Sequence, residues 1–164
     1  MSFRIEKDLA DALETEATIK NITPSTLLNQ ILQHHIGYEG NKGKAGLVSF
    51  SKHLIARLME GYPEKKIIAM AEYISKDPMT DTMAVLKLDY SLEIFLSMIE
   101  DYAKDNNFAF RHIIKGNMNT CILQHDMGRN VSVYLAHLYK YVIEELAQKR
   151  VAIDITNNTV GFRF

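Results

Sequence analysis

The residues best equipped for chemistry gather in the second half of the chain, where imidazole, thiol and carboxyl groups recur: His112, Cys121, His125, Asp126 and His137. Residues 108–114 and 120–125 have the composition of β-strands, and the glycine and asparagines of the loop Lys115–Asn119 are typical of a turn, so the sequence predicts a hairpin. Alternation along the paired strands would bring His112, Cys121 and His125 to one face. Imidazole and thiolate ligate zinc, nickel or copper, so these three residues are candidate metal ligands, although their spacing matches no known ligand motif.

A nucleophilic site is a second chemical interpretation of the same residues. Cys121 would attack a substrate, His125 or His137 would act as the base, and Asp126 would orient the imidazole. Cys121 lies inside an apolar segment, however, with no glycine-rich turn or helix start beside it to supply an oxyanion site. A cysteine in such a segment behaves as a small hydrophobic residue. We therefore expect no enzyme activity and no cofactor, with a metal or small-molecule effector as the alternative.

The start of the chain predicts one strand and two helices. Met1–Glu6 alternates, with Phe3 and Ile5 on one face and Ser2, Arg4 and Glu6 on the other. Two amphipathic helices follow, divided at residues 21–24, where Thr23 before Pro24 is a helix-start signal. So small a segment cannot bury enough apolar surface alone, and a single strand leaves its backbone groups unpaired. An intertwined dimer is therefore expected.

Residues 1–38 resemble the ribbon-helix-helix DNA-binding domains of the Arc and MetJ type. The resemblance rests on the motifs Phe3-Arg4-Ile5, Lys7-Asp8-Leu9, Leu13, Thr23-x-Ser25, Leu27-Leu28 and Ile31-Leu32. In that family the strands of two subunits pair antiparallel, and the ribbon enters the major groove.

The resemblance also implies which residues meet DNA. Ser2 and Arg4 fall on the base-reading face of the ribbon, and Thr23, Ser25 and Thr26 fall at the helix start that clamps a phosphate. The alternatives are that Arg4 is an ordinary surface arginine and that Thr23 only caps its own helix.

Charge and composition suggest two domains with different roles. Residues 1–39 form the expected ribbon-helix-helix domain, residues 40–46 with their three glycines the linker, and residues 47–164 the second domain. Residues 1–46 carry five basic and six acidic side chains, so this part is not a basic module, and counterion release by lysine and arginine supplies most non-specific DNA affinity. Residues 47–164 carry 14 of each sign, which gives no hint of a nucleic-acid or membrane partner.

The second domain is expected to be α+β. Helical periodicity covers residues 49–60, a stretch opened by Pro63, a stretch from Asp77-Pro78 to about Leu88, and residues 91–105. A further helix follows Gly128, and residues 151–155 and 160–164 alternate about Asn157-Asn158, which predicts a second hairpin. The result is a small antiparallel sheet of about four strands covered by helices.

These observations indicate a cytoplasmic, sequence-specific DNA-binding transcriptional regulator, a repressor or autoregulator. It would act as a homodimer or a tetramer, and the second domain would sense a signal or hold subunits together. The single cysteine fits a reducing compartment, and no apolar run is long enough to span a membrane, so no membrane partner is expected. The alternative is an antitoxin-like or adaptor protein whose C-terminal domain binds a protein partner.

Overall fold

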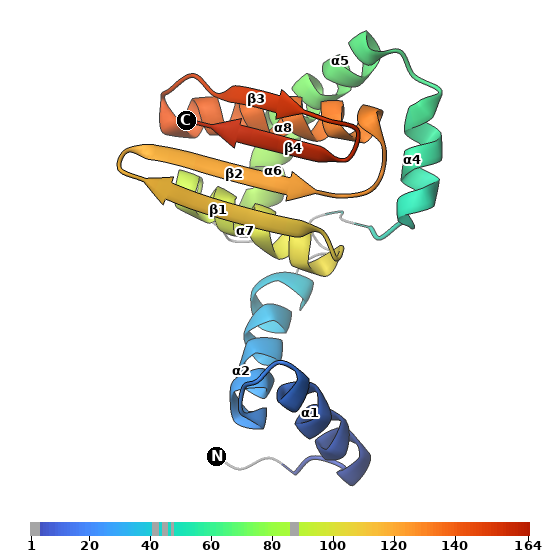
Figure 1. Ribbon diagram of the computed structural model, residues 1–164, viewed down its shortest axis with the longest axis vertical. Coiled ribbons are helices and arrows are strands. Elements are labelled where there is room, and N and C mark those ends of the chain that lie inside the picture. Colours follow the sequence, from blue (N-terminus) through green and yellow to red (C-terminus); the bar gives the residue numbers. More distant parts are fainter. Residues whose placement is uncertain (1–3, 41–42, 44–45, 47, 86–88) are drawn as a thin grey trace. The chain divides into compact units, whose positions relative to one another are not determined.

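The computed structural model describes residues 4–40, 43, 46, 48–85 and 89–164. The chain divides into two compact units, residues 1–47 and residues 48–164 (Figure 1). The boundary falls at the end of the glycine-containing stretch expected to be the linker, of which residues 41, 42, 44 and 45 lie outside the described part. No helix among the described residues is both long enough and apolar enough to cross a membrane.

The N-terminal unit consists of two helices and a short π-helical extension. Its elements are α1 (Lys7–Ile19), α2 (Pro24–His34) and η1 (His35–Glu39). The predicted start of the second helix at Pro24 is confirmed. The predicted strand at residues 1–6 is not seen as a strand: residues 1–3 lie outside the described part, and residues 4–6 lead into α1 without regular structure, Glu6 being extended at φ −62° and ψ 146°. A strand needs a hydrogen-bonded neighbour, and a second chain would have to supply it.

The C-terminal unit is α+β, as predicted, and its helices lie close to the expected positions. They are α4 (Lys52–Glu60), α5 (Glu64–Ser75), α6 (Asp77–Val85), α7 (Leu92–Asp105) and α8 (Arg129–Ala147). Ser51 and Ser91 cap α4 and α7 by accepting the N–H groups of Leu54 and Ile94. The aspartate-proline pair Asp77-Pro78 marks the start of α6, which begins at Asp77, and the Thr80 N–H bonds to Lys76 O.

Four strands form one antiparallel sheet in the order β1-β2-β4-β3. They are β1 (Ala109–Lys115), β2 (Met118–Gln124), β3 (Ala152–Ile155) and β4 (Thr159–Arg163). The first hairpin turns more tightly than expected, at Gly116-Asn117, where Gly116 adopts φ +58°.

The second hairpin is present, as predicted, but its turn does not use the positive φ that asparagine residues tolerate and that a tight asparagine turn requires. Neither Asn157 nor Asn158 has a positive φ. The Thr156 hydroxyl instead accepts the N–H groups of Asn158 and Thr159 and so shapes the turn.

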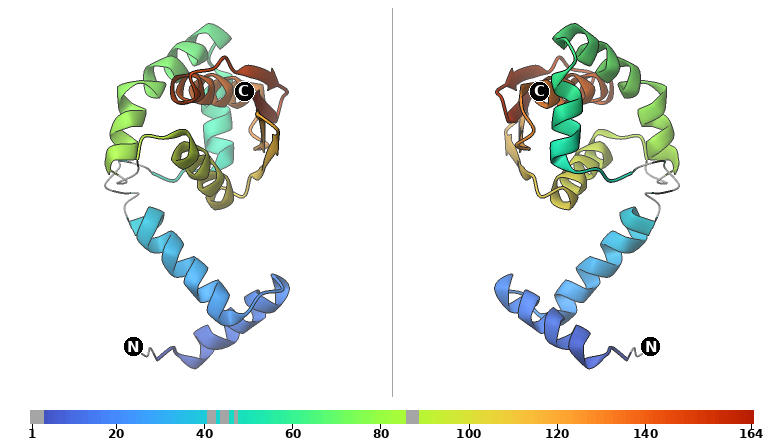
Figure 2. Two further views of the ribbon diagram at one scale, coloured as in Figure 1. Left: turned by 90° about the vertical axis from the view of Figure 1, so that its left-hand side faces the viewer. Right: turned by 90° about the vertical axis from the view of Figure 1, so that its right-hand side faces the viewer.

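The core of this unit lies between the helices and one face of the sheet (Figure 2). Cys121 and Leu123 of β2 and Val160 and Phe162 of β4 point into it and are buried. Tyr139 of α8 packs against Phe162 and Phe95, at ring-centroid distances of 5.8 and 6.0 Å. The helices thus cover one side of the sheet, while the strand residues that alternate with these point away from the core.

Candidate nucleic-acid interface

Arg4, the predicted base-reading residue, is exposed on the segment that precedes α1. No side chain makes a capping hydrogen bond at the start of α1. Ser2, the second predicted base contact, lies outside the described residues. Arg4 is therefore exposed to solvent, and its contact with a base stays a prediction.

The predicted phosphate residues meet at the first turn of α2. Thr23 Oγ1 accepts the Thr26 N–H at 3.1 Å, and the hydroxyl oxygens of Thr23 and Thr26 are 2.8 Å apart. The helix cap is therefore confirmed. Pro24 has no N–H, and the N–H groups of Thr26 and Leu27 bind Thr23, so among the described contacts the Ser25 N–H is the donor left open at this positive end of the helix.

The apolar faces of α1 and α2 are mostly uncovered within one chain. Only Ala17 and Leu27 are buried in the described part of this unit. The large apolar side chains that remain exposed, with exposed fractions from 40% to 80%, are Ile5, Leu9, Ile19, Ile31, Leu32 and Ile36. A soluble unit rarely exposes so much of its apolar surface without a partner.

The predicted metal ligands share a face of the hairpin but do not form a site. His112 pairs with Cys121 in the strand register, and His125 follows on the same side of the chain. His112 is exposed, and its Nε2 lies 2.8 Å from Asn119 Oδ1. Cys121 is buried, and this burial raises the pKa of its thiol to about 11, so the thiolate that binds metals is disfavoured. Within the described residues no group of three His, Cys, Asp or Glu side chains could hold a metal ion.

His125 has a structural role instead. Its ring is fully buried, Nδ1 accepts the Met127 N–H at 3.0 Å, and Nε2 lies 2.8 Å from Ser132 Oγ. Because Nδ1 accepts, Nε2 carries the proton and donates to Ser132, whose hydroxyl donates in turn to Asn157 O. Burial lowers the pKa of His125 and favours the neutral ring. With both nitrogens engaged, the imidazole joins β2, α8 and the β3–β4 turn and is not available to a metal or to Cys121.

The proposed nucleophilic group is not assembled either. His125 is bonded to Ser132, and it lies four positions after Cys121, which is about 13 Å along an extended chain. His137 lies on α8 with its ring 6.4 Å from that of Tyr141, and burial lowers its pKa.

Two polar contacts that the sequence did not indicate attach other helices to α8. Tyr141 donates to the Glu72 carboxylate of α5, and this hydrogen bond raises the pKa of Tyr141 to about 12. Asn130 Nδ2 donates to the carbonyls of Met59 and Tyr62 and fixes the α4–α5 connection. Neither contact has a sequence signal, because each joins residues about 70 positions apart.

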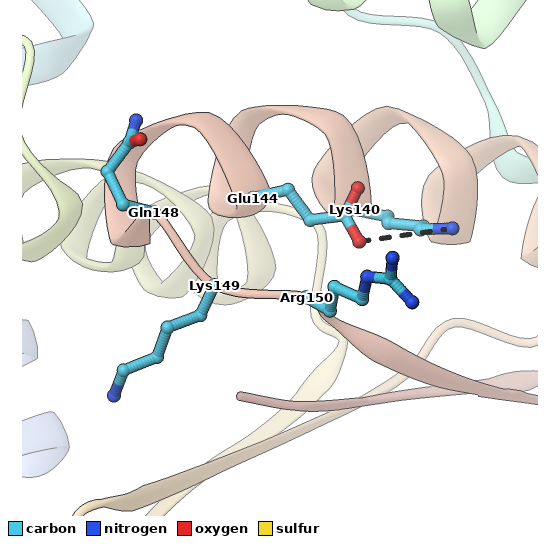
Figure 3. A pocket seen from close by; sticks show the side chains of 5 residues that line it. All are labelled: Lys140, Glu144, Gln148, Lys149 and Arg150. Carbon is cyan, nitrogen blue, oxygen red and sulfur yellow. Dashed lines mark ion pairs between the residues drawn. The ribbon is translucent and has the colours of Figure 1, made fainter.

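A shallow hollow of about 560 Å³ lies at the end of α8 (Figure 3), lined by Lys140, Glu144, Gln148, Lys149 and Arg150. Glu144 accepts the Val151 N–H at 3.0 Å and pairs with Lys140 at 4.0 Å, so its carboxylate fastens α8 to the strand that follows. Lys149 points away from this pair, while the Arg150 guanidinium lies beside it. The hollow is a surface feature of this connection.

Comparisons of this chain with protein-family models, curated proteins and solved structures found no match.

Proposed function

We propose that the protein is a homodimeric DNA-binding regulator in which the N-terminal units of two copies pair. The uncovered apolar surface of α1, α2 and η1 carries this proposal. Among its described residues this unit buries only Ala17 and Leu27, and so small a core does not make a domain stable alone. A second copy would cover Leu9, Ile31 and Leu32 and so supply the missing core.

Pairing would also give the segment before α1 a strand to hydrogen-bond with. Residues 4–6 of two chains could then form an antiparallel ribbon, as in the ribbon-helix-helix domains that this region resembles. Arg4 would face outward and donate two hydrogen bonds to guanine O6 and N7, with Ser2 beside it. The Ser25 N–H and the hydroxyls of Thr23 and Thr26 would hold a phosphate at the start of α2.

The test is selection of duplexes from a random pool by the full chain, followed by fluorescence anisotropy with the preferred site. Arg4→Ala should weaken binding by about 1–3 kcal/mol and relax the preference at one base position. Lys20→Ala is the matched control, because Lys20 pairs with Glu16 at 2.6 Å at the other end of α1. Failure to enrich any site, together with no salt-dependent binding, would contradict the proposal.

An exposed stripe beside α4 favours a second candidate function, that of an adaptor that binds a protein partner. Helix α4 contributes no fully buried residue. Exposed apolar side chains instead follow one another at intervals of four, namely Phe50, Leu54, Leu58 and Tyr62.

Sedimentation of the purified chain tests what this stripe contacts. If species larger than two chains form and Leu58→Ser removes them, the stripe joins copies of a regulator. If only two-chain species form and no DNA binds, the adaptor becomes the better account.

A further inference from the structure

The helices of the C-terminal unit lie on one side of its sheet, and no described element of this unit covers the other side (Figure 1, Figure 2). The strand register aligns its residues in four rows across the sheet. These are Ala109, Gln124 and Thr159; Arg111, Ile122, Gly161 and Asp154; Ile113, Thr120, Arg163 and Ala152; and Lys115 and Met118. We call this surface the open face. Ile113, Ile122 and Met118 are exposed on it although they are apolar.

The charge on the open face is mainly positive. It carries Arg111, Lys115 and Arg163 but a single carboxylate, that of Asp154. Arg163 pairs with Asp154 at 2.9 Å, and because both side chains are more than half exposed the pair is weak. Arg111 and Lys115 form no ion pair with any described residue.

This positive charge is local. Residues 48–108 carry seven basic and ten acidic side chains, whereas residues 109–164 carry seven basic and four acidic ones. The even balance of the whole unit therefore conceals an acidic part, α4 to α7, and a basic part that contains the sheet and α8. Three of the seven basic residues of the latter part lie on strands, and the other four lie on or directly after α8. A basic face on an otherwise balanced domain attracts a polyanion.

We propose that the open face contacts the phosphate backbone of DNA and supplies affinity that the N-terminal unit lacks. This inference rests on the DNA-binding function proposed above. Residues 1–46 carry a formal charge of −1, so a dimer of N-terminal units alone gains little from counterion release. The open face adds three cations and one carboxylate per chain, a net formal charge of +2.

Spacing and composition both fit a backbone contact. Arg111 and Lys115 are four positions apart on β1, which is about 13 Å and corresponds to the rise of roughly four base pairs along the axis of a DNA duplex. The open face has no aromatic side chain on which an unpaired base could stack, so it fits a duplex backbone and no particular sequence. A second copy stacked on the same face would oppose like charges, and this disfavours self-association there.

The experiment measures DNA affinity of the full chain against salt concentration. The variant Arg111→Gln, Lys115→Gln, Arg163→Gln is compared with Arg57→Gln, Lys65→Gln, Lys66→Gln on α4 and α5. Both sets remove three exposed cations, and each includes one paired arginine, since Arg57 pairs with Glu60 at 2.7 Å. The open-face variant should bind every sequence at least about tenfold more weakly than the natural chain and should keep its site preference. The slope of log affinity against log salt concentration should be lower by about 0.9 for each phosphate that the protein no longer neutralises. The control variant should keep the slope of the natural chain.

A modification experiment on the unmutated chain supplies a second readout. Bound DNA should protect the Lys115 amine from acylation, while Lys65 should react as fast as in the free protein. Equal slopes for the two variants, or no protection of Lys115 on DNA that the chain binds, would overturn the inference and leave the N-terminal interface standing. Protection of Lys115 without DNA, rising with protein concentration, would show that another copy covers the face and would also overturn it. No DNA binding at all would remove both proposals.

Discussion

Truncation of His125 to alanine should destabilise the C-terminal unit more than any other single histidine change. The ring is fully buried and packs edge-on against Phe108 at a centroid distance of 6.2 Å. Removing a buried ring of this size costs about 3–5 kcal/mol in comparable cores. The change also leaves the Met127 N–H and the Ser132 hydroxyl without their partner, and an unsatisfied buried polar group costs about 1–3 kcal/mol. Because alanine leaves space in which water can reach these groups, we expect a total near 4 kcal/mol.

Urea unfolding of the full chain, followed by near-ultraviolet circular dichroism, measures this change. Seven of the eight tyrosines lie in residues 48–164, so the signal reports mainly on the C-terminal unit. The matched control is His53→Ala, because His53 is exposed on α4 and its loss should change stability by less than about 0.5 kcal/mol. A loss below about 1 kcal/mol for His125→Ala would refute the reasoning that this network fastens β2, α8 and the β3–β4 turn together.

Three further predictions follow from the described contacts. Burial lowers the pKa of His125 below its ordinary 6.5, so as the pH falls the unfolded chain takes up the proton before the folded chain does. The free energy of unfolding should therefore be fully retained above about pH 6.5 and should fall as the pH drops toward the pKa of the folded state. Urea titrations at each pH would measure this fall, which should be smaller in His125→Ala. Cys121, with its thiol pKa raised to about 11, should react with a thiol reagent only in urea, and rapid reaction of the folded chain would contradict its burial. Thr23→Asp should keep the cap of α2 and the helix content, but it should weaken DNA binding by charge repulsion. Thr23→Ala should lower the stability measured in thermal unfolding by about 1 kcal/mol. Equal DNA affinity for Thr23→Asp and the natural chain would exclude a phosphate at this position.

Local signals in the sequence predicted the elements of the fold well. Thr23-Pro24 predicted the start of α2, and apolar periodicity predicted the helices of the C-terminal unit. The β1–β2 hairpin followed from strand composition around Gly116. These features depend on residues within a few positions of one another, which is why sequence reasoning reaches them.

Contacts between distant segments could not be predicted in the same way. The pairing of β4 with β2, which leaves β3 at the edge, depends on how α8 packs across the sheet. The roles of His125 and Glu72 depend on partners contributed by α8, and the candidate metal site failed because those partners occupy the imidazole. The ribbon around Arg4 is a different case, since its hydrogen-bonding partner would come from a second chain.

The central claim is that two copies of the chain associate through their N-terminal units, and sedimentation equilibrium of the full chain tests it most directly. We expect a mass of twice 18.7 kDa, reduced to that of one chain by Ile31→Asp and unchanged by Ile114→Asp, which alters a similarly exposed isoleucine on β1. A single-chain mass for the natural protein, or a two-chain mass that Ile31→Asp leaves intact, would contradict the account.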